Sequence, residues 1–276
     1  MFYLHKSGEA LTILLIGILV SLLSSTSIAD TNRAELLKIA DTKKSGEYVR
    51  KRFLEKIKKP FNATSKKKAL IIGDSHAQDF FNIVLENGYL QNYQISTRYI
   101  PTRCQIYLGE NRARHIKPKD KVLCSKSDNL SQAKKQITEA DLIILAASWK
   151  EWTVKELPQT IDNLGLRSQQ KLLIIGRKNF GKISIRHYLR LPEDKLRGLR
   201  NQVDTHQNKI NGIMNKTLDK SQFVDIHGLI CGTSSTSCPV FTNDLKLISF
   251  DGGHLTKDGA QYVGKILFQT PLLKNL

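Results

Sequence analysis

The sequence predicts a three-layer α/β/α domain in which a parallel sheet of about five strands lies between two layers of helices. Short apolar runs recur along the chain, and helix-like segments separate them. Strands that are apolar throughout are typical of parallel sheets that are covered on both faces. The expected strands are residues 69–72, 94–100, 142–146, 172–175 and 223–226.

Helix signals fill the intervals between these runs. Thr256 is a good N-cap for a last helix, because its side-chain oxygen can accept a backbone N–H. Ligands of open parallel sheets bind beyond the carboxyl ends of the strands, so we expect the functional site at that edge. The expected helices are residues 78–88, 131–140, 154–164, a long charged stretch over 192–218, and 256–268.

The N-terminal residues divide the chain into three segments. Residues 1–29 read as a signal peptide or an N-terminal membrane anchor: a polar start with Lys6, an apolar stretch over 10–23, and small residues at Ser27 and Ala29 that suit a signal peptidase. Both alternatives place the protein outside the cytoplasm, in the periplasm or cell envelope. Residues 30–67 are expected to form a basic linker or helical segment, and residues 68–276 the catalytic domain.

The chain is strongly basic, with 43 Lys and Arg against 25 Asp and Glu and a formal net charge of +18. The basic residues are densest over 50–68. Such a run is either a solvated linker or a segment attracted to anionic lipid head groups or acidic glycans. Nucleic acid is not an expected partner, because the N-terminus indicates export.

Four cysteines are consistent with an oxidising compartment. They allow three pairings, of which the local one, Cys104 with Cys124 and Cys231 with Cys238, is the most economical. A zinc site is the competing use, but the Cys-x2-Cys spacing typical of such sites is absent. We therefore expect two disulfides and no metal.

Two short stretches supply a serine, an aspartate and a histidine. Residues 73–76 read Gly-Asp-Ser-His directly after the first apolar run, and residues 250–255 read Phe-Asp-Gly-Gly-His-Leu. Ser75 is expected on a sharp strand-to-helix turn, where its oxygen is exposed and backbone N–H groups point at the same place. A serine nucleophile needs a base, and the base needs a third group that fixes its tautomer. His254 and Asp251 fit these two roles.

A second pair, Asp225 and His227, competes for the role of the base because it follows another expected strand. His76 follows Ser75 directly, so its side chain is expected to point away and to be structural. Trp149 and Trp152 are the only tryptophans, and both follow the strand 142–146. They either close the edge of the core or offer a platform for a sugar ring.

The motifs at 73–77 and 251–256 resemble the first and last motif blocks of the SGNH (GDSL-like) hydrolase superfamily. More narrowly, they resemble the SGNH domain fused to membrane acyltransferase-3 proteins, which O-acetylate bacterial surface polysaccharides. The resemblance extends from Lys66 to the C-terminus. It implies a flavodoxin-like fold with Ser75 as the nucleophile, His254 as the base and Asp251 as its orienting partner.

The oxyanion hole departs from the superfamily's pattern. Where its asparagine is expected, residues 146–150 read Ala-Ala-Ser-Trp-Lys. Losing one hole donor typically costs ~3 kcal/mol of transition-state stabilisation. Candidate replacements are the Ser148 hydroxyl and a loop amide near Gly109, with Trp149 beside them.

These observations predict an extracytoplasmic serine acyl-transfer enzyme, an O-acetyltransferase that acts on a cell-envelope polysaccharide through an acyl-serine intermediate. The alternatives are a GDSL-like carbohydrate esterase or deacetylase, and a catalytically weak glycan-binding or assembly protein. No cofactor is expected. A transferase would need a membrane partner protein as its acyl donor, and the N-terminus offers a means of association with the membrane.

Overall fold

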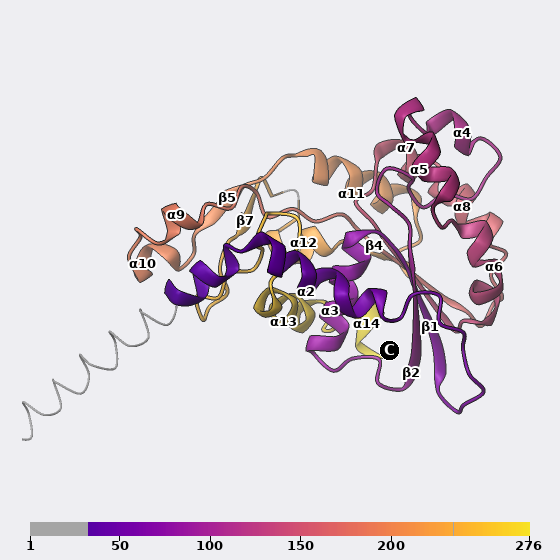
Figure 1. Cartoon of the computed structure of the whole chain (residues 1–276), viewed down its shortest axis with the longest axis horizontal. Helices are drawn as coiled ribbons and strands as arrows, with labels where there is room; N and C mark the ends of the chain where they lie inside the picture. The colour runs from indigo at the N-terminus through magenta and orange to yellow at the C-terminus, as the bar shows by residue number, and fades with distance from the viewer. Residues whose placement is uncertain (1–32, 234) are drawn as a thin grey trace, which may run out of the picture.

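The computed structural model describes residues 33–233 and 235–276. At its centre lies a parallel sheet of five strands in the order β2-β1-β3-β4-β6 (Figure 1). The strands are β1 (Lys67–Gly73), β2 (Tyr93–Tyr99), β3 (Leu142–Ala146), β4 (Lys171–Ile175) and β6 (Phe223–Val224). This topology is flavodoxin-like, and it confirms the expected fold class and the five expected strands.

Side chains of the strands alternate between two apolar cores. Leu70 and Ile72 of β1 belong to one core, and Ala69 and Ile71 belong to the other. The second of these cores lies under α2 (Thr42–Leu54), α3 (Ser75–Glu86) and α13 (Lys257–Leu267). The opposite face is covered by α6 (Leu130–Glu139), α7 (Glu151–Lys155), α8 (Leu157–Leu164) and α11 (His206–Thr217) (Figure 1).

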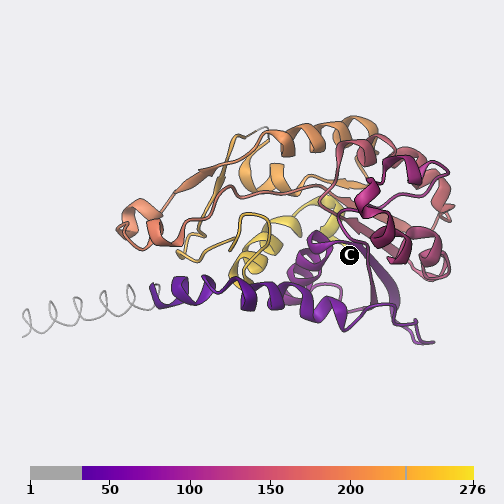
Figure 2. The ribbon, with the colours of Figure 1, turned by 45° about the horizontal axis from the view of Figure 1, so that its top comes forward.

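A small arm extends from this three-layer body. It contains the antiparallel pair β5 (Arg200–Gln202) and β7 (Ser237–Pro239) and the short helices α9 (Ile185–Tyr188) and α10 (Glu193–Leu196). Both views place α9 and α10 at the end of the molecule remote from β1 and β2 (Figures 1 and 2). Tyr188, Leu196 and Phe241 pack there with Leu36, which lies in the helical residues 33–39.

Short helices complete the described chain. They are α4 (Arg112–His115), η1 (Pro118–Asp120), α5 (Lys121–Lys126), α12 (Ile226–Cys231) and α14 (Pro271–Lys274). The last expected helix is confirmed as α13, which Thr256 caps by accepting the N–H of Gly259 at 2.9 Å.

The expectation of one long helix over 192–218 is wrong. The structure has α10, then β5, and only then α11. Gly198 adopts a left-handed φ of 74° just after α10, and Asp204 accepts the N–H of His206 at the start of α11. The pairing of β5 with β7 outweighs the helical propensity of the charged residues between these two breaks.

Two other helices differ from expectation at their ends. The expected helix 154–164 is divided into α7 and α8, and Pro158 lies in the first turn of α8. Proline lacks the N–H that a continuous helix would need at this position. Helix α3 begins at Ser75 rather than near Gln78, because Asp74 caps it by accepting the N–H of His76 at 2.9 Å.

The expected linker 30–67 contributes a packed helix. Phe53 of α2 is fully buried and meets Phe81 of α3 edge to face, with 6.2 Å between the ring centroids. Asn82 donates to the carbonyl of Val49 at 3.0 Å. Helix α2 is therefore part of the folded body, although it carries many of the basic residues.

The expected signal peptide or anchor, residues 1–29, lies outside the described residues. Within 33–233 and 235–276, no helix combines the length and the apolar character needed to cross a membrane.

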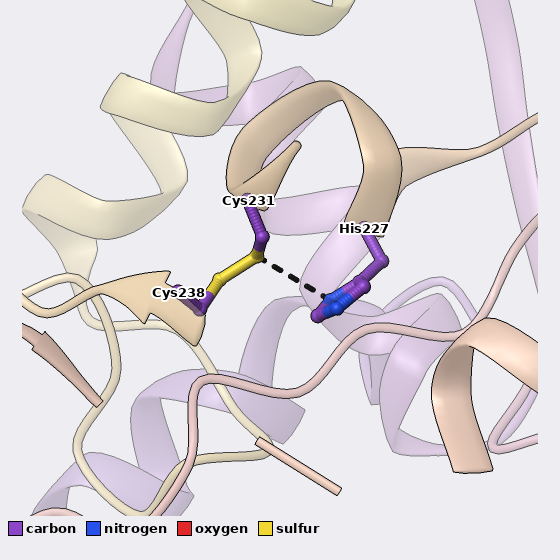
Figure 3. Close-up of side chains that lie close together, drawn as sticks. All are labelled: His227, Cys231 and Cys238. Carbon is purple, nitrogen blue, oxygen red and sulfur yellow. Dashed lines mark hydrogen bonds between the residues drawn. A yellow bond between two sulfur atoms is a disulfide. The ribbon is translucent and has the colours of Figure 1, made fainter. Parts of the chain in front are cut away.

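Both local cysteine pairs lie at disulfide distance, as expected. Cys104 and Cys124 have Cα atoms 5.3 Å apart, and Cys231 and Cys238 have Cα atoms 4.5 Å apart. The second bridge joins the end of α12 to β7, next to His227 (Figure 3). It therefore ties the arm to the body of the domain.

Gly73 is the position in β1 that tolerates no side chain. A Cβ there would lie 1.7 Å from the carbonyl oxygen of Ala146 in β3, and its φ is 155°. We expect Gly73→Ala to lower the free energy of unfolding by ~3 kcal/mol or more, as measured by urea denaturation. Gly165→Ala is the control, because Gly165 has a φ of 61° but nothing within 4 Å. That change should cost only ~1 kcal/mol, and equal losses in the two variants would contradict the steric argument.

Candidate active site

Asp74 organises the turn between β1 and α3. Its carboxylate is fully buried and caps α3, and it also accepts the Thr102 hydroxyl at 2.6 Å and the N–H of Ser148 at 2.9 Å. Burial raises the pKa of Asp74, while these hydrogen bonds act to lower it. A single side chain thus fastens the loops that follow β1, β2 and β3 to one another.

Ser75 is the first residue of α3, at the carboxyl edge of the sheet. The first N–H groups of a helix have no partner within it, and the helix dipole places partial positive charge at the same end. The backbone at Ser75 is therefore suited to stabilising an oxyanion that forms beside the serine oxygen.

Asp251 and His254 form a hydrogen-bonded pair within one tight loop. The Nδ1 atom of His254 lies 2.7 Å from one carboxylate oxygen of Asp251. The other oxygen accepts the N–H groups of Gly253 and His254, both at 2.8 Å. With Nδ1 bound to the carboxylate, Nε2 is the nitrogen that remains free to take a proton.

The two groups shift each other's pKa in opposite directions. Burial acts to raise the pKa of Asp251, but the hydrogen bonds and charge of His254 lower it to about 2. Burial acts to lower the pKa of His254, while the hydrogen bond of Asp251 and the charge of Asp79 act to raise it, and the net direction is upward from 6.5. Asp251 therefore stays ionised wherever His254 is neutral.

Ser75 and His254 line the same cavity, which has a volume of about 410 Å³. Within the described part of the chain, the Ser75 hydroxyl and His254 are not joined by a hydrogen bond. Catalytic hydrogen bonds often tighten only when substrate is bound. The remaining walls are Gln78, Tyr99 and Phe250, with Gly46, Val49, Arg50 and Leu54 from α2.

A buried ion pair that the sequence interpretation missed lies behind this cavity. Lys178 follows β4, and its ammonium group lies 2.5 Å from the carboxylate of Asp79. The side chains are 2% and 0% exposed, respectively. The available sequence signals were the i+4 spacing of Asp79 from Ser75 and the position of Lys178 shortly after a strand.

The candidate oxyanion and substrate residues have different surroundings. Ser148 lies beside Asp74, which takes its N–H, so only its hydroxyl remains as a donor. Trp149 is fully buried and donates to the carbonyl of Ile175 at 2.8 Å, which makes it a core residue. Gly109 lines a separate cavity of about 460 Å³, so the structure does not bring it to Ser75.

Trp152 also packs against protein rather than facing the site. Its ring stacks on His115, with 4.3 Å between centroids. Besides Asp74, the buried Gln105 holds the loop that carries Ser148. Its side-chain amide accepts the N–H of Lys150 at 2.9 Å and donates to the carbonyl of Ser148 at 3.2 Å. Gln105 was not singled out from the sequence.

The competing pair lies elsewhere. Asp225 caps α12 by accepting the N–H of Gly228 at 3.0 Å, and it also accepts the Asn211 amide at 2.7 Å. His227 is buried, with its Nδ1 atom 3.4 Å from the sulfur of Cys231 (Figure 3). Among the described residues, His227, Cys231 and Cys238 form a group of three potential metal ligands whose ligand atoms lie within 4.8 Å of one another, but the two sulfurs are bonded to each other.

No protein of curated function matches the sequence. The periplasmic domain of the lipopolysaccharide acetyltransferase from Salmonella ser. Paratyphi A has a similar fold, with a TM-score of 0.55 and 15% sequence identity over 86% of this chain and 98% of that chain. The profile of the SGNH domain (fused to AT3 domains) matches residues 44–269. The chain therefore belongs to this SGNH domain family.

Proposed function

We propose that this protein is an extracytoplasmic serine acyl-transfer enzyme that acetylates a cell-envelope polysaccharide. The observation that carries the proposal is the shared cavity of Ser75 and His254, in which the histidine is oriented by Asp251. Membership of the SGNH family supports an acyl-transfer or esterase-type role.

The arrangement supports a two-step transfer. In the first step, the Ser75 oxygen attacks the carbonyl carbon of the acetyl donor and its proton passes to Nε2 of His254. The donor's leaving oxygen departs with that proton, which leaves acetyl-Ser75. In the second step, His254 takes the proton of an acceptor hydroxyl, the acceptor oxygen attacks the acetyl group, and the proton returns to Ser75.

The nature of the acceptor distinguishes the two enzymatic alternatives. A sugar hydroxyl makes the protein an O-acetyltransferase, and water makes it a carbohydrate esterase. The fusion of this family to AT3 domains supports transfer, with a membrane AT3 protein as the acyl donor. The structural neighbour is the periplasmic domain of a lipopolysaccharide acetyltransferase, which supports a polysaccharide acceptor. A catalytically weak glycan-binding protein is the non-enzymatic alternative.

We also infer that the protein lies outside the cytoplasm. The neighbouring structure is a periplasmic domain, and both disulfides suit an oxidising compartment. Residues 1–29 would direct export as a signal peptide, or hold the domain at the membrane as an anchor.

Acetylation of Ser75 is the most direct test. Incubation with 4-nitrophenyl acetate should add one acetyl group, located on Ser75 by peptide mass spectrometry. Ser75→Ala should abolish the adduct and the turnover, and His254→Ala should abolish the turnover, because the attack then lacks a base. Ser168→Ala is the control, because Ser168 is exposed and remote from the site. Ser249→Ala would be less informative, because the Ser249 hydroxyl is hydrogen-bonded to the loop of the site. Full turnover by Ser75→Ala would discard the mechanism.

The pH dependence of acylation should report His254. Since the base must be neutral and its pKa is raised, the acylation rate should increase as the pH rises through a value above 6.5. Asp251→Asn should cut the rate by ~10⁴, because the wrong tautomer presents N–H to the serine. It should also lower the pKa of His254, which stopped-flow pH profiles and imidazole NMR can measure. Histidine titrates within the range from about pH 5 to about pH 9. A wild-type acylation rate that stays constant over this range would rule out His254 as the base.

Helix α2 should contact the bulkier part of the substrate. A Cβ at Gly46 would meet only the Arg50 guanidinium, at 3.6 Å, so Gly46→Leu should fold and project into the cavity. We expect kcat/KM for glucose penta-acetate to fall by ~10-fold relative to that for 4-nitrophenyl acetate. Gly212→Leu in α11 is the matched control, because its Cβ meets nothing within 4 Å. An unchanged ratio in Gly46→Leu would exclude α2 from substrate binding.

A further inference from the structure

Asp79 and Lys178 bond the backbone on both sides of His254. The ammonium group of Lys178 donates to the carbonyl oxygen of Gly253, and the carboxylate of Asp79 accepts the N–H of Leu255 at 3.2 Å. The two groups also bond each other at 2.5 Å. The residues that flank His254 are thus both held by a single buried ion pair.

The pair connects the histidine loop to the helix that carries the nucleophile. Asp79 lies four residues after Ser75 in α3, so both side chains emerge on the same face of the helix. Lys178 comes from the segment after β4, at the same edge of the sheet. A shift of the loop relative to α3 would break the bond to Gly253, the bond to Leu255, or both.

We propose that Asp79 and Lys178 are positioning residues that fix the imidazole of His254 relative to the Ser75 oxygen. The catalytic meaning of this inference rests on the proposed function. Its structural content, that the ion pair sets the position and environment of His254, stands independently of any reaction.

A purely stabilising role explains the arrangement less well. Buried ion pairs are poor sources of stability, and apolar residues of similar volume often replace them without loss. In this pair the remaining hydrogen-bonding capacity is directed to the two peptide groups that flank His254. A catalytic group must be held to within ~0.5 Å of its productive position, which such charge-assisted bonds can provide.

The charges around His254 predict opposite effects for the two single substitutions. Asp79 acts to raise the pKa of His254 and Lys178 acts to lower it, after the effects of burial and of the bond to Asp251. Lys178→Met should therefore raise the pKa of His254, and Asp79→Asn should lower it. Among the described residues, the titratable or charged groups that face His254 are Asp251 in its own loop, Asp79 and His76 in α3, Lys178 after β4, Arg50 in α2 and Tyr99 in β2.

The test uses the full chain and two readouts. Imidazole NMR titration, assigned with His254→Gln, measures the pKa of His254 and its Nδ1–H signal in Lys178→Met and Asp79→Asn. Kinetics with 4-nitrophenyl acetate use the charge-neutral double variant D79N/K178M, which leaves no unpaired buried charge if a single variant fails to fold. We expect kcat to fall by at least ~10-fold with KM changed by less than about twofold.

A second buried ion pair provides the matched control. Arg98 of β2 lies 2.9 Å from Asp128, and neither residue lines the cavity of Ser75 and His254. R98M/D128N should leave kcat and the His254 signals unchanged at a temperature where the protein is folded. Unchanged His254 signals in the folded single variants, or a kcat within about twofold of the wild type in D79N/K178M, would overturn the inference. If Ser75 is never acylated but the NMR shifts occur, the proposed function fails and the positioning inference stands.

Discussion

The buried carboxylate of Asp74 is the constraint on which the site depends. A buried carboxylate must find hydrogen-bond donors. Asp74 finds them at His76 in the first turn of α3, at Thr102 after β2 and at Ser148 after β3. These contacts fix the direction in which α3 leaves β1. Because α3 carries both Ser75 and Asp79, the placement of the serine and the anchoring of the histidine loop follow from the same turn.

One wall of the cavity that Ser75 and His254 share comes from α2, in a segment whose composition alone predicts a basic linker. Helix α2 is fixed by the burial of Phe53 and by the ion pair of Arg52 with Glu86. Its other side brings Arg50 and Leu54 to the cavity, so a cation and an apolar side chain both face the place where a substrate would lie. The high positive charge of the chain therefore bears on the site as well as on solvation.

Local sequence signals were sufficient for the sheet and for the Asp251–His254 pair, since apolar strand runs and a three-residue spacing are set by neighbouring residues. They were insufficient where a partner lies far along the chain. Lys178 gains its role only when α3 and the histidine loop meet beside it. The residues 200–202 look helical until β7 pairs with them, and Gly109 falls in a loop that runs to a different cavity.

The ion pair of Asp79 and Lys178 is a better anchor for the loop that carries His254 than either charge alone. A lone buried lysine would lower the pKa of His254, and a lone buried aspartate would raise it, because each acts on the imidazole at short range. Together they supply strong hydrogen bonds to Gly253 and Leu255, while their effects on the pKa of His254 oppose each other. Asp251 is then left as the main group that raises the pKa of the histidine, and the same hydrogen bond that orients the imidazole also sets its basicity.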